Sequence, residues 1–373
     1  MKHSRLLPIV ILLALVTGPL PSLGQVTTLS EKKITAAAID GFIKAAMDSL
    51  QMPGLSVTII NDGKIVYNRS MGFTNIDKGT KTDETTIFEA GSLSKPVFTF
   101  FVLKMVDEGL LNLDTPLYRY MPYSDIDKDE RYTLITARIV LSHQSGFPNW
   151  RYFEKPDSTL HIKYGELWLK FTPGTQFAYS GEGYFYLAKV IAQLKHTNLQ
   201  GLDSVFQSEI ARPLHLQHFY FSGNPYISQH KATGYKQGKV SAKKWPVAFP
   251  TQDSSWFGAA GGLHTNVTDY ANFLVALMNE KGISKSLLSE MLQPQIELPK
   301  ASTMVTEEGY VAWGLGIALK NSPYGVLHLH GGNNGDFQSG FVIDKSKKWG
   351  FVFFTNCDKG SAFNKKLQAL LLQ

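Results

Sequence analysis

The chain contains one cysteine, Cys357, among its 373 residues. One cysteine cannot form an intramolecular disulfide, so a disulfide framework is excluded and the fold must be stabilised by its hydrophobic core. With 43% hydrophobic and 18% charged residues, the sequence is not that of a disordered or fibrous chain. Its length predicts one large domain or two closely packed ones. Cys357 follows an apolar run, and we expect it to be buried and not nucleophilic.

A cluster of basic residues is also missing. Lysine and arginine number 37 against 31 acidic residues, a formal net charge of +6, which becomes +4 once Lys2 and Arg5 are removed (37 − 2 against 31). This small, dispersed surplus predicts no nucleic-acid partner. No group of histidines and carboxylates supplies the three or four ligands of a zinc site, so the sequence predicts no metal and no cofactor. His328 and His330 share one face of a predicted strand and keep a metalloenzyme as an alternative.

Only near the N-terminus does a long apolar run occur, at residues 6–16. It follows Lys2 and Arg5 and precedes small and helix-breaking residues up to Gly24. This arrangement predicts a secretory signal peptide over residues 1–24. The run is shorter than the ~20 apolar residues of a membrane-spanning helix. We therefore expect an exported protein, periplasmic or secreted, with no stable membrane insertion after signal cleavage.

Periodicity in the mature chain predicts strands at both ends and a helical region between them. Residues 31–51, after the expected N-cap Ser30, and residues 269–278 and 362–372 have helical spacing. The predicted strands are 55–60 and 64–67, joined as a hairpin, followed by 310–319, 325–330, 338–343 and 350–355. This order predicts an α+β fold in which residues 25–100 and 255–373 build one sheet region and residues 101–254 form an inserted, mostly helical region.

The most informative segment is Ser-Leu-Ser-Lys at residues 92–95, which precedes an apolar run typical of a buried helix. If a helix begins here, Ser92 and Lys95 share one face. A serine at the positive end of a helix, with a lysine one turn on, can be deprotonated and acylated. Ser-x-x-Lys also occurs at residues 30–33, 228–231 and 241–244, but without such a helix, and there we expect solvated surface residues.

Two further segments can complete a site. Tyr179 lies in a glycine-bounded turn, where a phenol can project into a cleft. His330 ends an apolar strand and is followed by Gly331 and Gly332, which allow close approach of another backbone or a substrate. Taken alone, Tyr179 would be interpreted as a half-buried packing residue and His330 as a strand-end histidine near a turn.

In this order the three segments resemble the serine β-lactamase and penicillin-binding-protein superfamily, and most closely its class C β-lactamase-like branch. The supporting segments are residues 52–57, 141–146, 260–263 and 268–269, and the likeness runs from about residue 31 to 360. The resemblance implies a β-lactamase/transpeptidase-like fold, with an antiparallel sheet, flanking helices and the active site between the sheet and the helical insert.

The resemblance also implies roles for the matching residues. Ser92 would be the acylated nucleophile and Lys95 its activating partner. Tyr179 would match the tyrosine of Tyr-x-Asn, and His330 would stand at the lysine of Lys-Thr-Gly. The backbone N–H groups of Ser92 and Asn333 would form the oxyanion hole, usually the largest single catalytic contribution.

Two departures from the pattern affect the expected substrate. Gly181 replaces the asparagine of Tyr-x-Asn, and His330 offers no permanent charge for a substrate carboxylate. We therefore expect an exported serine hydrolase that acts on an ester, amide or lactam, with an esterase or D-amino-acid peptidase/amidase favoured over an efficient β-lactamase. The substrate would be a small molecule or a cell-wall peptide. Predicted substrate-binding residues are Gly181, Gly331, Gly332, Trp150 and Trp256. A penicillin-binding or peptidoglycan-sensing module that acylates with little turnover is the alternative.

Overall fold

The structure, a computed structural model, describes residues 25–156, 158–242 and 256–373. The predicted signal peptide, residues 1–24, lies outside these residues. The described residues form the helices α1 (Ala36–Leu50), α2 (Ser94–Asp107), α3 (Ala137–Leu141), α4 (Gly181–Leu194), α5 (Leu202–Phe206), α6 (Pro225–His230), α7 (Val267–Met278), α8 (Lys285–Leu292), α9 (Thr303–Thr306) and α10 (Gly360–Leu371).

The strands among the described residues are β1 (Gln25–Thr27), β2 (Lys33–Thr35), β3 (Gly54–Asn61), β4 (Lys64–Asn75), β5 (Thr80–Lys81), β6 (Phe88–Glu89), β7 (Phe219–Tyr220), β8 (Tyr235–Lys236), β9 (Lys239–Val240), β10 (His264–Thr265), β11 (Ile296–Glu297), β12 (Ala312–Trp313), β13 (Ala318–Ser322), β14 (Gly325–Asn333), β15 (Gln338–Asp344) and β16 (Trp349–Thr355).

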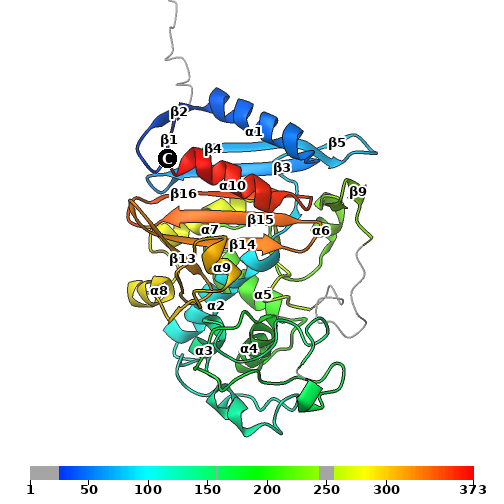
Figure 1. Cartoon of the computed structure of the whole chain (residues 1–373), viewed down its shortest axis with the longest axis vertical. Helices are drawn as coiled ribbons and strands as arrows, with labels where there is room; N and C mark the ends of the chain where they lie inside the picture. Colours follow the sequence, from blue (N-terminus) through cyan, green and yellow to red (C-terminus); the bar gives the residue numbers. More distant parts are fainter. Residues whose placement is uncertain (1–24, 157, 243–255) are drawn as a thin grey trace, which may run out of the picture.

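The main sheet of the described residues has nine antiparallel strands in the order β11-β12-β13-β14-β15-β16-β3-β4-β5. β16 pairs with β3, with Phe353 opposite Val57, so strands from the two ends of the chain meet inside one sheet. Helices α1 and α10 cover one face and α7 covers the other (Figure 1). Both faces are therefore covered, which explains why every residue of β3, β15 and β16 is buried and burial does not alternate along these strands. The predicted α+β fold with an antiparallel sheet built from both chain ends is confirmed.

Several element boundaries differ from those predicted from the sequence, and two of the differences have a clear structural cause. The first helix begins at Ala36 and not after Ser30, because residues 33–35 pair with β1 as strand β2. Thr35 is the N-cap, and its side chain accepts a hydrogen bond from the Ala38 N–H. The strand predicted at 310–319 is divided into β12 and β13 by a turn at Gly316, whose φ of +70° favours glycine.

In the sequence, the described residues between the N-terminal and C-terminal strands of the sheet include α3 to α6 and long irregular segments (Figure 1). Helix α2 is buried on nearly all sides, with a core of aromatic and aliphatic side chains between it, α4 and α7. The division of the chain into residues 25–100 with 255–373 and residues 101–254 stays a prediction. Within the described residues, none of the helices has the length and apolarity needed to span a bilayer.

A buried ion pair fixes the segment before α4. The guanidinium of Arg151 donates two hydrogen bonds to the carboxylate of Glu182, at 3.0 and 2.8 Å, and the Arg151 main-chain N–H donates a third at 3.0 Å. The side chain of Glu182 is fully buried in the first turn of α4. Arg151 also donates to Asp125 at 2.6 Å and to the Tyr123 hydroxyl at 3.0 Å. These bonds hold the neighbouring residue, Trp150, against the start of α4.

We expect Arg151→Met to lower the free energy of unfolding by about 3–5 kcal/mol, because it leaves the buried carboxylate of Glu182 without its cation. Urea unfolding monitored by fluorescence would measure the loss. Arg131→Met is the matched control, because Arg131 pairs with Asp129 at the surface and such pairs contribute about 0–1 kcal/mol. Equal losses in the two variants would contradict the assignment.

Candidate active site

Ser92 lies in a tight 3₁₀ turn, Gly91–Leu93, directly before α2. The helix therefore begins two residues later than the sequence predicts, but the turn keeps Ser92 and Lys95 on one side. The hydroxyl of Ser94 donates to the Gly91 carbonyl at 2.6 Å and accepts from the Leu263 N–H at 3.0 Å. Ser94 thus joins the turn to segment 260–263, one of the segments on which the resemblance rests.

Strand β14 crosses this turn at very short range. A Cβ atom on Gly332 would lie 2.2 Å from the Ala90 carbonyl oxygen and 2.2 Å from the Ser339 hydroxyl. A Cβ atom on Gly91 would lie 2.8 Å from the main-chain nitrogen of Asn333. The Ser339 hydroxyl donates to the Ala90 carbonyl at 2.7 Å and joins β15 to the same turn. Glycines are therefore required on both sides, and the main chain of Asn333 lies beside the Ser92 turn, as expected for the predicted oxyanion hole.

Lys95 is buried, with 2% of its surface exposed. Its ammonium donates to the Ala260 carbonyl at 2.8 Å and to the Ser92 Oγ at 3.4 Å, and it lies 4.5 Å from the centre of the Tyr179 ring. No ion pair of the described residues includes it. Burial without a counter-ion lowers the pKa of the Lys95 amine to about 7. A large fraction of the amine is therefore neutral near pH 7 and can accept the Ser92 proton.

Tyr179 precedes α4, whose N-cap Ser180 accepts a hydrogen bond from the Gly183 N–H at 3.1 Å. Burial raises the pKa of the Tyr179 phenol well above 10, and a hydrogen bond to Ser92 partly offsets this. The phenol stays protonated at neutral pH, so it can relay or donate a proton to a group at Ser92 but does not begin as the base.

His330 is a neutral imidazole within this site. Its Nδ1 contacts the Gly331 carbonyl oxygen at 2.8 Å, which makes Nδ1 the donor and leaves Nε2 as an acceptor. Nε2 is buried and has no partner in the described residues. Burial, with the charge of Lys95, lowers the pKa of His330 to about 3. An acceptor nitrogen repels a carboxylate, so His330 cannot replace the lysine of Lys-Thr-Gly in that role.

The sequence interpretation missed His143, which it included only within the supporting segment 141–146. His143 has a φ of +59° and is fully buried. Its Nδ1 accepts a hydrogen bond from the Ser180 N–H at 3.1 Å, its carbonyl oxygen accepts from the Ala178 N–H at 2.8 Å, and its ring packs on Tyr179 with centres 4.2 Å apart. His143 therefore positions Tyr179. A lone histidine between small residues gives no sequence signal of such a contact.

The glycine at position 181 has a steric cause. A Cβ atom there would lie 2.4 Å from the indole of Trp150, so an asparagine could not stand at this position unless Trp150 moved. The Asn149 side-chain oxygen accepts from the Gly181 N–H at 3.0 Å and strengthens the contact between the two segments. The position of the Trp150 indole therefore depends on glycine at position 181.

Two cavities meet at Ser92. One of about 420 Å³ is lined by Lys95, Trp150 and Trp256, and one of about 270 Å³ is lined by His330 with Gly331 and Gly332. Ser92, Tyr179 and Asn333 line both. The structure thus brings together all the predicted catalytic and oxyanion residues. Of the predicted substrate-binding residues, Gly181 alone lines neither cavity and acts through Trp150.

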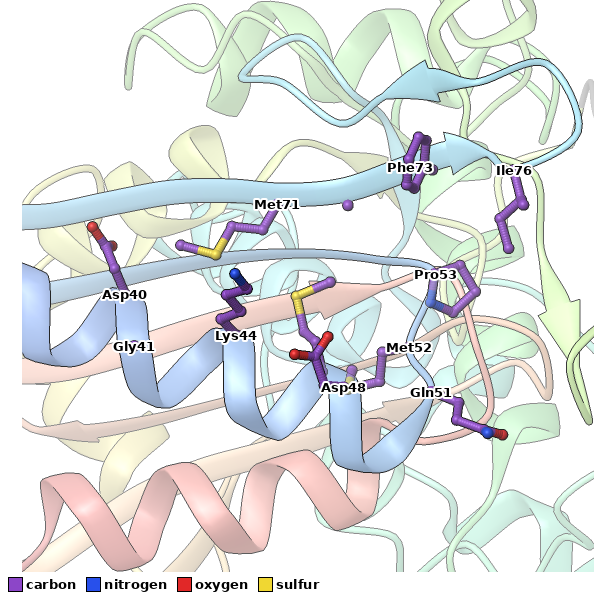
Figure 2. A pocket seen from close by; sticks show the side chains of 12 residues that line it. Asp40, Gly41, Lys44, Asp48, Gln51, Met52, Pro53, Met71, Phe73 and Ile76 are labelled. Carbon is purple, nitrogen blue, oxygen red and sulfur yellow. The ribbon is translucent and has the colours of Figure 1, made fainter.

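A larger groove of about 660 Å³ lies elsewhere, between α1 and β4 (Figure 2). Methionines and Phe73 line its floor, and Asp40, Lys44 and Asp48 stand along the helix at its rim. None of the predicted catalytic residues reaches it. Its larger volume therefore does not identify this groove as the active site. Among residues 25–156, 158–242 and 256–373, no three His, Cys, Asp or Glu side chains are grouped as metal ligands.

Comparison with known proteins is consistent with this geometry. The family model described as Beta-lactamase matches residues 39–373, so the chain belongs to the β-lactamase family. This confirms the predicted superfamily of serine β-lactamases and penicillin-binding proteins.

Among curated relatives, Protein flp of Staphylococcus aureus (strain COL) is 26% identical over 328 residues, which cover 85% of this chain and 62% of that protein. The chain thus spans about three-fifths of the length of the first curated relatives that it matches. The mitochondrial serine beta-lactamase-like protein LACTB of Bos taurus is 23% identical, with 78% of this chain and 67% of that protein covered.

Solved structures show the same fold. The octameric penicillin-binding protein homologue from Pyrococcus abyssi superposes with a TM-score of 0.74 and 24% identity, over 91% of this chain and 78% of that one. The structure titled SurE superposes with a TM-score of 0.70 and 19% identity, over 90% and 75% of the two chains.

We expect acylation of Ser92 to depend on the ionisation of Lys95. Only the neutral amine accepts a proton, so the rate of labelling by a fluorophosphonate should rise with pH and be half-maximal near pH 7, the value to which burial lowers the Lys95 pKa. Labelling rates between pH 5 and 9 would measure this. His264 lines the same cavity and carries an imidazole, which ordinarily titrates near ~6.5. A midpoint that moves in His264→Asn would assign the ionisation to that histidine instead.

Proposed function

We propose that the protein is a serine hydrolase that forms an acyl-enzyme at Ser92 and hydrolyses it. Family membership supports this class of enzyme. The observation that carries the proposal is the buried Lys95, which lacks a counter-ion and lies 3.4 Å from the Ser92 hydroxyl. A stabilising role for this lysine would call for a carboxylate partner, whereas a base needs the lowered pKa that burial provides.

The proposed reaction follows from the positions of the side chains. The neutral amine of Lys95 accepts the Ser92 proton as Oγ attacks the substrate carbonyl carbon. The main-chain N–H groups of Ser92 and Asn333 donate to the developing oxyanion, a contribution of about 10²–10³ in rate per donor. The leaving group then takes a proton through the Tyr179 hydroxyl, and water attacks the acyl-enzyme to return Ser92 and release the acid.

We further propose that esters or D-amino-acid amides are better substrates than β-lactams. The Trp150 indole stands where an asparagine amide would bind the acylamide of a penicillin, and the acceptor nitrogen of His330 does not hold its carboxylate. Export through the residue 1–24 signal is part of the same proposal, because a cell-wall peptide is a substrate only for an exported enzyme.

We expect Ser92→Ala to abolish covalent labelling by a fluorophosphonate, because it removes the nucleophile. Mass spectrometry of the intact protein would measure the added mass. Ser30→Ala and Ser241→Ala are matched controls from other Ser-x-x-Lys segments and should label as the unaltered protein does. Labelling of Ser92→Ala at another serine would overturn the assignment.

In a second experiment, a short acyl ester and a penicillin are compared in one preparation. We expect kcat/KM to be higher for the ester by at least about tenfold, which corresponds to one lost interaction of ~1.4 kcal/mol with the penicillin. Efficient penicillin hydrolysis would show that other groups bind the lactam. A burst of one acyl group per protein without turnover would instead identify a module that acylates and holds the acyl group.

A further inference from the structure

The cavity of about 270 Å³ on the His330 side is lined by residues from several elements. Met304 of α9, together with Glu308 and Tyr310 from the segment that follows it, forms one wall, and Trp313 of β12 adds another ring. Helix α10 contributes only neutral groups, Ser361 and Asn364. The cavity therefore contains aromatic rings, amide and hydroxyl groups and one carboxylate.

Glu308 is the only residue with a permanently charged side chain among the described residues that line this cavity. Its carboxylate takes part in no ion pair of the described residues. The nearby ammonium of Lys320 donates instead to the main-chain carbonyl of Glu308, at 2.9 Å. The Glu308 carboxylate is therefore not paired with a cation, and the Lys320 ammonium is held on the main-chain side of the same residue.

Glu308 shares this cavity with Tyr310, Tyr179 and Ser92. Tyr310 is half-buried, and burial together with the Glu308 carboxylate raises the pKa of its phenol. Lys95 lines the other cavity and not this one. The part of a substrate that enters here thus meets the Glu308 side chain, aromatic rings and the neutral imidazole of His330.

We propose that this cavity binds a positively charged leaving group, so that the preferred substrates are esters or amides whose departing alcohol, thiol or amine carries an ammonium. This inference rests on the proposed acyl-enzyme function. By the resemblance, the cavity lies where Lys-Thr-Gly would hold the carboxylate attached to the departing nitrogen of a lactam. In this chain the charge preference of the cavity is the opposite, because a carboxylate and ring faces attract a cation and repel an anion.

Three thioesters with the same butyryl group test the charge directly. Their thiols are thiocholine, which is cationic, 3,3-dimethylbutanethiol, its neutral isostere, and 3-mercaptopropionate, which is anionic. We expect kcat/KM for the cation to exceed that for the neutral thioester by about 3-fold to 30-fold, the range of a cation beside a ring and a partly exposed carboxylate. The anionic thioester should be slower than the neutral one.

The matched variants are Glu308→Gln and Glu307→Gln. Glu307 is the exposed neighbour and does not line the cavity. Glu308→Gln should lower the cation-to-neutral ratio toward the part that the aromatic rings contribute, because kcat/KM falls more for the cationic thioester than for the neutral one. Glu307→Gln should leave the ratio as it is. Glu308→Lys should make the anionic thioester the faster of the two charged ones.

The outcomes separate this inference from the proposed function. If the neutral thioester is hydrolysed through Ser92 but the charge of the thiol has no effect, or Glu308→Gln leaves the ratio unchanged, the inference is wrong and the serine hydrolase stands. If no thioester is hydrolysed and Ser92 is not labelled, the proposed function itself fails.

Discussion

The active site depends on burying one amine without an opposite charge. An isolated charge in a protein interior is strongly disfavoured, so a lysine in such a place loses its proton more readily and is surrounded by dipoles instead of ions. Lys95 is held by the Ala260 carbonyl oxygen and by the ring of Tyr179. Helix α2 is almost completely enclosed by its neighbours, which keeps water from the amine. The same enclosure that stabilises the fold thus lowers the pKa of the Lys95 amine.

This burial sets the protonation state of the other site residues. The positive form of Lys95 disfavours a second cation nearby, which adds to the burial that keeps His143 and His330 neutral. With both imidazoles neutral and the phenol of Tyr179 protonated, Lys95 alone among these four groups changes charge near neutral pH. Lys95 has no ion-pair partner among the described residues. It can therefore accept the Ser92 proton without a second charged side chain having to move.

Much of this arrangement could be predicted from the sequence, because it depends on local spacing. Ser92 and Lys95 lie three residues apart, and a helix or a tight turn brings both to one side. One sheet built from both chain ends also followed from the strand patterns there, whereas its antiparallel arrangement was implied by the resemblance. The start of α1 was wrong because the pairing of Lys33–Thr35 with Gln25–Thr27 overrides helical spacing, and no pattern within residues 31–51 reports that partner.

Long-range contacts account for the residues that the sequence could not reveal. His143 becomes significant only through its contact with Tyr179, and Glu308 only through the cavity that it shares with residues of β14 and α10, all far away in the chain. A lone histidine or glutamate in an irregular segment carries no periodicity that would distinguish it from a solvated residue. Resemblance identified the motif positions, whereas these two residues required the folded geometry.

The Trp150 wall of the 420 Å³ cavity depends on a buried ion pair that also contributes to the stability of the fold. Trp150 can occupy the space beside Gly181 only because Arg151 is tied by three hydrogen bonds to Glu182, which follows Gly181 in α4. The desolvation cost of that ion pair is offset by its geometry, with both carboxylate oxygens and the guanidinium paired. An ion pair of this kind contributes less to net stability than to the choice of one loop conformation. Its consequence for the site is that the Trp150 indole, which lines the cavity beside Ser92, stands against Gly181 next to a buried ion pair.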